Sequence, residues 1–539
     1  MNNISFKVDD IKSVNIFPVI SSQKYVNMDR NTANLNMAVD TAVNKYNKGI
    51  VEQLNNGDEK TYTNKIGTFT KGLVHDDNGI VDKASYDTLF KAITFKTPSL
   101  FEEIKLGGHH KLTNPQGGLS YNLEGLDTCG IYIKPSPKVS SDEAMGELIE
   151  NYWMSVCRDV NFIDYDINPD TIAASLDLTN RRVFTGPKID NKVTTKTLFK
   201  GISGLIGPYI SQFLYLQVPF GAVQINQQMK TYNPNINFMT SFDIWLNIQN
   251  GNLPTEIASF DPVLRYIRNG RDLAQWVHND ILYQAYFNAM LILMRTPSEE
   301  SQYGGIGCPF NPTNPYTNST TQFGFATFGA PHISSLMAEV AQKAMKITWN
   351  KKWYVNKRLR PEAMGGLLHS NYIGETDYPI SDDYKNSTVL SYIYDKYGSY
   401  LLPQAFPEGS PTHPSYPAGH ATVAGSCVTI LKAFFDENFV ISSPVIPSSD
   451  GLTLEPYVGS QLTVLNELHK IADNVGIGRN HAGVHYRSDS INSILLGEQY
   501  AISVLVDHIK LYNEDFSGWK FTKFDGTTVI INKSGTNII

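Results

Sequence analysis

The spacing of apolar residues between positions 141 and 512 is the feature that most constrains the fold of this 539-residue chain. Apolar side chains recur there every three or four positions, which is the period of a helix with one buried face. Strand-like alternation is rare before the tail, where it appears at 527–531. Helices are therefore expected at 143–153, 271–294, 331–349, 419–436, 461–475 and 489–512. The second of these reads as one long buried helix, and the last opens with the capping pair Ser488-Asp489.

These segments predict a mainly α protein of packed helical bundles, with two four-helix-bundle-like halves, an N-terminal elaboration and long loops. Residues 1–140 are rich in Asn, Asp, Lys and Gly, and are expected to form the elaboration. Residues 141–340 would make a first helical-bundle region, 341–515 a second, and 516–539 a C-terminal tail. The Gly-, Pro- and Asn-rich segment 296–328 is expected to be a connection.

The composition excludes several classes of partner. A formal net charge of -7 gives no general attraction to nucleic acid or to an anionic membrane. No apolar run approaches the ~20 residues that span a bilayer, and the N-terminus lacks the pattern of a secretory signal. We therefore expect a soluble, cytoplasmic protein. Its widely spaced cysteines are expected to be buried thiols, neither disulfides nor zinc ligands: Cys129, Cys157, Cys308 and Cys427.

The segment His413-Pro-Ser-Tyr-Pro-Ala-Gly-His420 precedes one of the expected helices. Pro417 does not extend a helix backwards, and Gly419 allows close backbone approach. Gly419 and His420 are thus expected at a helix N-terminus, where free N–H groups and the helix dipole favour an anion. Taken alone, the segment is better explained as a Pro/Gly turn before a helix, with an incidental histidine.

Two further stretches carry basic residues. Arg479 and His485 flank Gly483 between two expected helices, and Lys352 and Arg360-Pro361 end a basic run that contains aromatic residues. Taken alone, each has an ordinary structural interpretation, as a helix-terminal charge, a core histidine or a solvated face. Together, Lys352, Arg360 and Arg479 supply three fixed cations, with Arg offering planar forked donors and Lys a point charge. The combination predicts a pocket for a small, highly charged oxyanion.

These pieces, in this order, resemble the vanadium-dependent haloperoxidases, which share their site with type 2 phosphatidic acid phosphatases and bacterial class A acid phosphatases. The family pattern of Lys, Arg-Pro, Pro-Ser-Gly-His and Arg-x5-His appears here as Lys352, Arg360-Pro361, Pro417-Ala-Gly-His420 and Arg479-x5-His485. The segments HPSYP, NYWMSVCRDVNFIDYD, LFKGISGLIGPYISQFL and YVNKRLRPEAMGG are similar to the algal bromoperoxidases in particular. The resemblance covers roughly residues 140–512.

The resemblance implies a role for each matching position. His485 would coordinate the vanadium of bound vanadate, His420 would be the acid–base group, and His413 would lie near the approaching halide. The remaining oxygens of vanadate would be held by Lys352, Arg360, Arg479 and the Gly419 N–H. The implied activity is oxidation of bromide and iodide by hydrogen peroxide, to a hypohalous species that halogenates small organic acceptors. A homodimer or larger homo-oligomer and a structural calcium are implied in the same way.

One position departs from the family pattern, because Ala418 stands where the family has a serine whose hydroxyl bonds a vanadate oxygen. Losing that donor costs about 1–3 kcal/mol if the oxygen stays unsatisfied. A water or Ser415 would be the candidates to replace it.

Two other functions use the same residues. A phosphomonoesterase (acid phosphatase) would employ His485 as nucleophile and His420 as general acid. A non-catalytic phosphate-binding protein would need only the cations. The length of the chain and its algal-type flanks favour the haloperoxidase.

Overall fold

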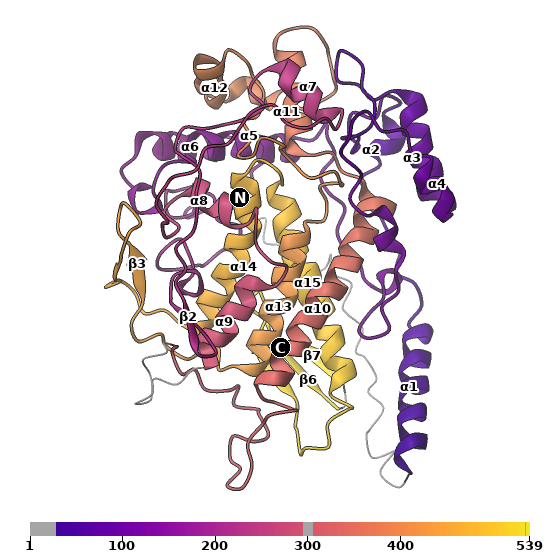
Figure 1. Cartoon of the computed structure of the whole chain (residues 1–539), viewed down its shortest axis with the longest axis vertical. Coiled ribbons are helices and arrows are strands. Elements are labelled where there is room, and N and C mark those ends of the chain that lie inside the picture. The colour runs from indigo at the N-terminus through magenta and orange to yellow at the C-terminus, as the bar shows by residue number, and fades with distance from the viewer. Residues whose placement is uncertain (1–27, 295–304, 534, 539) are drawn as a thin grey trace.

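Four long helices form the centre of the molecule. The computed structural model describes residues 28–294, 305–533 and 535–538. The helices α10 (Ala330–Asn350), α13 (Gly419–Phe434), α14 (Val464–His481) and α15 (Arg487–His508) run side by side along the long axis (Figure 1). Helix α13 lies at the middle of the group and packs on the other three. The prediction of a mainly α fold is confirmed.

Two glycines allow α13 and α15 to approach closely. A Cβ atom added at Gly425 would lie 2.0 Å from the carbonyl oxygen of Ile494, and one at Gly497 would lie 2.0 Å from that of Thr422. No side chain fits at either position, so the two backbones pack directly on each other. Because α13 begins at the expected anion site and α15 begins just after His485, this contact fixes two sides of the site.

Shorter helices cover one end and one side of the central group. At the upper end in Figure 1 lie α5 (Asp142–Val156), α6 (Pro169–Thr179), α7 (Phe242–Gln249), α11 (Pro361–Tyr372) and α12 (Val389–Tyr397). Helices α5, α6, α11 and α12 share a second apolar core that includes Leu148, Trp153 and Leu368. The side of the group is covered by α8 (Gly270–Trp276) and α9 (Gln284–Met294).

The N-terminal region follows the opposite side, as loops with the helices α1 (Arg30–Asn47), α2 (Asp58–Thr61), α3 (Lys83–Phe95) and α4 (Pro98–Glu102). The described residues also form short 3-10 helices: η3 (Pro115–Leu119), η4 (Thr128–Gly130), η5 (Phe162–Asp164), η6 (Gln212–Leu214) and η9 (Asp382–Asn386). A π-helical segment, η8 (Lys351–Asn356), continues α10 without a break.

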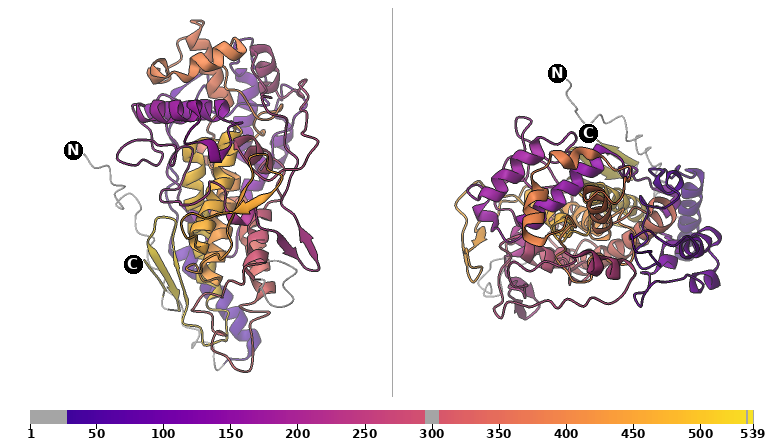
Figure 2. Two further views of the ribbon diagram at one scale, coloured as in Figure 1. Left: turned by 90° about the vertical axis from the view of Figure 1, so that its left-hand side faces the viewer. Right: turned by 90° about the horizontal axis from the view of Figure 1, so that it is seen from above.

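The strands are few and antiparallel. They pair as β1 (Val218–Phe220) with β2 (Val223–Ile225), β3 (Val445–Pro447) with β4 (Leu454–Pro456), and β5 (Trp519–Thr522), β6 (Thr528–Asn532) and β7 (Gly535–Ile538) in one sheet. Strand β6 confirms the strand expected in the tail. The three-stranded sheet lies along the central helices (Figure 2, left) and adds Trp519 and Ile531 to the main core.

Four sequence expectations need correction. The long helix expected at 271–294 is two helices, because the chain leaves the helix after Trp276 and resumes it at Gln284. Polar side chains of this break, His278 and Asp280, find partners outside the helix. Helix α14 runs to His481, so Arg479 lies inside a helix and not between two.

The start of α15 also differs from the expectation. Its N-cap is Tyr486, and Asp489 stands three residues inside, where its carboxylate accepts from the Tyr486 N–H. Cys129 is exposed, while the other three cysteines are buried as expected. The 296–328 connection has no long helix or strand over 305–328, and its first part lies outside the described residues. The proposed domain boundaries stay predictions. Within the described ranges, no helix is long and apolar enough to cross a membrane.

Candidate functional site

The site forms where the ends of four central elements meet. Lys352 lies on η8, directly after α10, and Arg360 is the N-cap residue of α11. Gly419 is the first residue of α13, as expected, and Arg479 lies in the last turn of α14. His485 follows Gly483, whose φ of +84° makes the turn between α14 and α15 possible.

Arg360 makes hydrogen bonds to several residues of the site. Its Nε donates to the carbonyl oxygen of His413 at 3.0 Å, and its Nη1 donates to that of Val484 at 2.8 Å. Its guanidinium also meets two imidazoles, with Nη1 3.0 Å from His485 Nε2 and Nη2 2.9 Å from His413 Nδ1. Burial and the nearby charge of Arg479 lower the pKa of Arg360 to about 9.

Lys352 and Arg479 are buried beside it. The Lys352 ammonium donates to the carbonyl oxygens of Pro414 (2.5 Å) and Ser415 (2.8 Å), which leaves one of its three protons without an acceptor among the described residues. Arg479 Nη1 donates to the Val277 carbonyl at 2.9 Å, while its buried Nε has no partner in the described part of the chain. Burial, followed by repulsion from Arg360, lowers the pKa of Lys352 well below its usual value.

No carboxylate pairs with any of these three cations within the described residues. Other buried cations of the molecule do have such partners, as Lys71 has Glu362, Lys432 has Glu498 and Arg487 has Glu150. Two buried cations elsewhere, Lys351 and Arg158, lack a carboxylate but donate to amide and carbonyl oxygens. Three unpaired buried charges in one place repel one another, and an anion between them would remove that repulsion.

His485 is held by a buried carboxylate. Asp489 Oδ2 lies 2.9 Å from His485 Nδ1 and also accepts from the Ser415 hydroxyl. Its Oδ1 pairs at 2.7 Å with Arg358, which in turn pairs with Glu147 at 2.9 Å. Burial raises the pKa of Asp489, but the Arg358 charge and the His485 hydrogen bond outweigh it and hold that pKa well below its ordinary value.

This arrangement sets the tautomer of His485. A carboxylate acceptor favours the proton on Nδ1, which leaves a lone pair on Nε2. Burial, and then the Arg360 charge, lower the pKa of His485 well below its ordinary value, so the ring is neutral at physiological pH. Its Nε2 lone pair accepts from Arg360 Nη1 at 3.0 Å, and this is the ring atom that would act as a ligand or a nucleophile in place of that hydrogen bond.

His420 has a partner that sequence reasoning did not find. Its Nε2 lies 3.0 Å from Asp280 Oδ1, and Asp280 belongs to the break between α8 and α9. The His420 side chain is 32% exposed, so it stands at the open edge of the site. The polar run His278-Asn-Asp280 inside an otherwise apolar pattern was the available signal for this carboxylate.

Aromatic and imidazole rings line the site on two sides. The His413 ring packs against Trp349, with ring centroids 4.8 Å apart, and burial lowers its pKa well below the ordinary value. Opposite Arg479, the Phe406 ring stacks on His278 at 3.7 Å, and His278 Nε2 lies 2.6 Å from Glu408 Oε1. The predicted site residues therefore lie together. The pair His278–Glu408 lies beside them and was not predicted from the sequence.

The N-terminus of α13 is open towards the site. The Gly419 N–H has no acceptor within the described residues, and Ala418 offers no side-chain cap. The Ala418 N–H donates to Ser493 Oγ at 2.8 Å. Ser415 does not replace the missing hydroxyl, because its own hydroxyl donates to Asp489 on the Nδ1 side of His485. In the described residues, the fixed donors of the site thus belong to Lys352, Arg360, Arg479 and Gly419.

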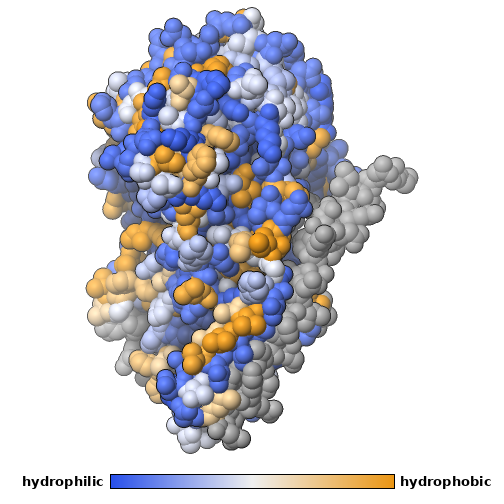
Figure 3. All heavy atoms as spheres, turned by 90° about the vertical axis from the view of Figure 1, so that its right-hand side faces the viewer, coloured by the Kyte–Doolittle hydropathy of each residue, from blue (hydrophilic) through white to orange (hydrophobic). Residues whose placement is uncertain are grey.

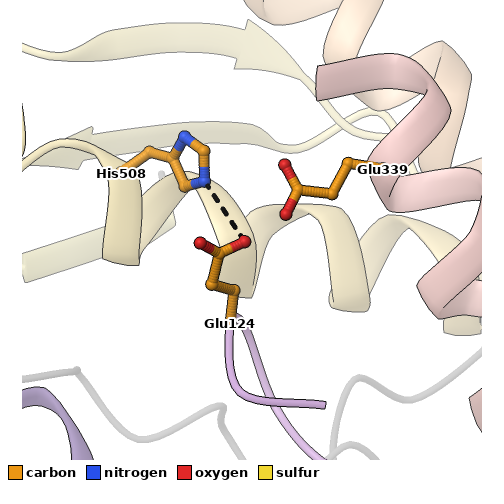
Figure 4. Close-up of side chains that lie close together, drawn as sticks. All are labelled: Glu124, Glu339 and His508. Carbon is orange, nitrogen blue, oxygen red and sulfur yellow. Dashed lines mark ion pairs between the residues drawn. The ribbon is translucent and has the colours of Figure 1, made fainter. Parts of the chain in front are cut away.

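A separate cluster was considered as a metal centre. In the described part of the chain, Glu124, Glu339 and His508 bring one ligand atom each within 4.8 Å of one another (Figure 4). The Lys343 ammonium already pairs with both carboxylates. Calcium binds six to eight oxygens. An ion pair network with two carboxylates and a lysine does not fit that ion, so we do not assign the expected calcium to it.

Comparisons with known proteins found similar chains. Residues 334–514 match a family model described as the VCPO second helical-bundle domain. The chain is 35% identical to a vanadium-dependent bromoperoxidase of Corallina officinalis, over 90% of this chain and 95% of that protein. It is 33% identical to one of Ascophyllum nodosum, over 90% of each chain. A solved structure of the second bromoperoxidase of A. nodosum, described as homohexameric, superposes with a TM-score of 0.87 at 32% identity, covering 93% of this chain and 90% of that one.

The Asp489 network generates a prediction about anion binding. In the variant Asp489→Asn, the amide replaces the carboxylate that orients His485 and balances Arg358. We expect the dissociation constant for orthovanadate to rise about 10–100-fold, as is typical when a supporting partner of a ligand is lost. Isothermal titration calorimetry measures it. The control is Asp473→Asn, which removes a buried carboxylate of α14 that accepts from Gly201 and Ile202; equal weakening in both variants would contradict the assignment.

The same variant tests the pH dependence of stability. The pKa of Asp489 is lower in the folded chain than the unfolded value of about 4. Its contribution to stability is therefore fully present above that unfolded value and is lost as the pH falls below it. The difference in urea unfolding midpoint between wild type and Asp489→Asn should shrink from pH 6 to pH 3, and a constant difference would refute it.

Proposed function

The chain belongs to the family of vanadium-dependent bromoperoxidases, and from this premise we propose how its residues bind vanadate and support the oxidation of bromide by hydrogen peroxide. One observation carries the proposal. In the described residues, three buried cations without carboxylate partners, Lys352, Arg360 and Arg479, lie close to one another, and Arg360 Nη1 donates to His485 Nε2 at 3.0 Å. Orthovanadate is a compact, multiply charged oxyanion, and this donor set fits its oxygens and its need for one nitrogen ligand.

We assign His485 as the ligand to vanadium. The hydrogen bond from Nδ1 to Asp489 keeps the proton away from Nε2, so a metal does not have to displace one there. The oxygens of vanadate would be bound by Lys352, by Arg360, by the Arg479 Nε and by the Gly419 N–H. These groups are already oriented by carbonyl oxygens of Pro414, Val484 and Val277, so little reorganisation is needed.

Vanadate, when bound, supplies Lewis-acid activation of hydrogen peroxide. The chain's own residues supply proton transfer and positioning. His420 shares a hydrogen bond with Asp280 and stands at the open edge, where it can take a proton from incoming peroxide and return it to a leaving oxygen. The Lys352 ammonium adds positive charge where negative charge develops. A bound anion would raise this depressed pKa and so favour the protonated form of Lys352.

Halide would approach along the rings of His413 and Trp349. His413 accepts from Arg360 through Nδ1 and is buried, so it is neutral and polarisable and carries no charge that would hold bromide tightly. Small organic acceptors would then react with the hypobromous product outside this narrow space. The phosphatase interpretation uses the same residues but is not favoured by any relative found.

The first test separates the two reactions. Vanadium-free protein is assayed for bromination of a phenolic dye with peroxide and bromide, with and without orthovanadate, and for hydrolysis of an aryl phosphate. We expect bromination that requires vanadate and is abolished by His485→Ala. The control His469→Ala removes another buried imidazole, which stacks on Phe524, and should keep the activity. Phosphate-ester hydrolysis without vanadate-dependent bromination would overturn the proposal.

A second prediction concerns Ala418, where the family has a serine. The Ser415 hydroxyl does not replace that donor, because it donates to Asp489. Restoring the donor by Ala418→Ser should tighten orthovanadate binding about tenfold, which corresponds to about 1.4 kcal/mol. Equilibrium titration measures the constant, with Ala421→Ser, one position past His420, as control. An unchanged or weaker constant would count against the lost-donor argument.

We also propose that the chain assembles with copies of itself. Helix α1 has no buried residue, and its apolar side chains Leu35, Val39 and Val43 recur every four positions and are between 48% and 63% exposed. Figure 3 shows the face that carries α1, with apolar side chains gathered over its lower half. An isolated helix of this length is marginal in water. A homohexameric relative supports a second copy as the partner.

The assembly is tested by light scattering coupled to size exclusion. The double variant Leu35→Asp, Val39→Asp should shift the protein to a smaller species, because two charges would be buried in the contact. Val458→Asp alters an equally apolar side chain that is 94% exposed and lies elsewhere, and should leave the size unchanged. A wild-type monomer, or a variant of unchanged size, would refute this surface. A bound calcium and a cytoplasmic location stay predictions without a structural site or signal to support them.

A further inference from the structure

A thioether lies directly against the anion site. Met345 is on α10, two helical turns before Lys352 and one before Trp349. A Cβ atom built on Gly419 would lie 3.3 Å from Met345 Sδ and 3.4 Å from Cζ3 of Trp349. The sulfur therefore packs on the backbone of the residue whose N–H we assign to vanadate. The Met345 side chain is only partly buried, so it lies at the edge of the site and not in the sealed core.

We propose that Met345 is an oxidation site of the enzyme itself, converted to the sulfoxide by the hypobromous product during turnover. This inference rests on the proposed function, since that reaction supplies the oxidant. A thioether beside the point of release meets the product before it is diluted into solvent. Methionine is among the side chains most readily oxidised by such species, and its sulfoxide is polar.

The reaction balances without a further reagent. The sulfur lone pair attacks the bromine of HOBr, an S–Br bond forms and the Br–O bond breaks, releasing hydroxide. Water then adds its oxygen to sulfur, bromide leaves, and two protons are lost, one of which neutralises the hydroxide. In total, the thioether and HOBr give the sulfoxide, bromide and one proton. Sulfur is oxidised by two electrons and bromine is reduced by two.

The other methionines provide internal references. Met145, Met154 and Met337 are fully buried, as are the other core methionines. Met28 is 38% exposed at the start of the described chain, ahead of α1. Bulk oxidant should therefore modify Met28 at least as readily as Met345. Oxidant released at the site should reverse that order, because only Met345 lies next to Gly419.

The modification would weaken the site that produces it. A sulfoxide oxygen is an acceptor, and at this position it would compete with vanadate for donors at the start of α13. It would also place a polar group in the apolar contact between α10 and α13. Turnover would thus lower vanadate affinity progressively, and methionine sulfoxide reduction would restore it.

The experiment compares two oxidant sources by peptide mass spectrometry. In one arm, the vanadate-loaded enzyme turns over peroxide and bromide. In the other, vanadium-free protein receives the same total amount of hypobromite in portions. We expect the ratio of Met345 to Met28 sulfoxide to be several-fold higher in the turnover arm, and to fall when bromide is left out. Equal ratios in the two arms, or an unmodified Met345 in an active enzyme, would overturn the inference.

A variant gives an independent readout. Met345→Leu conserves volume and is expected to fold normally. It should begin with wild-type activity and lose activity several-fold more slowly during sustained turnover. Met364→Leu, which changes a buried methionine in contact with the Tyr486 hydroxyl, should inactivate at the wild-type rate. Equal inactivation of Met345→Leu and wild type would contradict the role. Absence of vanadate-dependent bromination in wild type would instead refute the proposed function.

Discussion

The buried carboxylate of Asp489 is the interaction on which the site depends. It accepts hydrogen bonds from His485 Nδ1, the Ser415 hydroxyl and the Tyr486 N–H, and it pairs with Arg358. The Asp489 side chain thus connects the turn before α15, the segment before α13 and the segment before α11. Each of these segments carries a residue that faces the anion. Their relative positions are set by a single charge that does not itself face it.

The distribution of charge around Asp489 divides the cations into two groups. Arg358 is neutralised by Asp489 and Glu147 and stacks on Tyr486, with its guanidinium 3.8 Å from the ring centroid. Arg360, two residues further, donates to carbonyl oxygens and imidazoles only. A buried cation without a counter-ion is costly. The two arginines therefore have different roles although they are close in sequence. Arg358 stabilises the fold, and Arg360 is placed to bind an anion.

Much of the fold and of the site was predictable from local pattern. Helical spacing located α5, α10 and α13, and strand-like alternation located β6, because in those segments burial follows the local period. The Gly419-His420 start of α13 was predictable because proline and glycine act on their own neighbours. Local pattern did not predict the roles of Asp280, Asp489 and His278. Their importance comes from partners that lie far away along the chain, such as His420 for Asp280 and Arg358 for Asp489.

The break between α8 and α9 shows why periodicity fails at such a point. The segment 271–294 has enough apolar residues to continue as a helix, and no Pro or Gly interrupts it. What ends α8 is competition: the Val277 carbonyl accepts from Arg479, and Asp280 turns to His420. A charged hydrogen bond in a buried place is stronger than one more helical turn in water-exposed chain. Helix α8 therefore ends where the side chains of Arg479 and His420 need an acceptor. The departure of this segment from its helical preference coincides with the site.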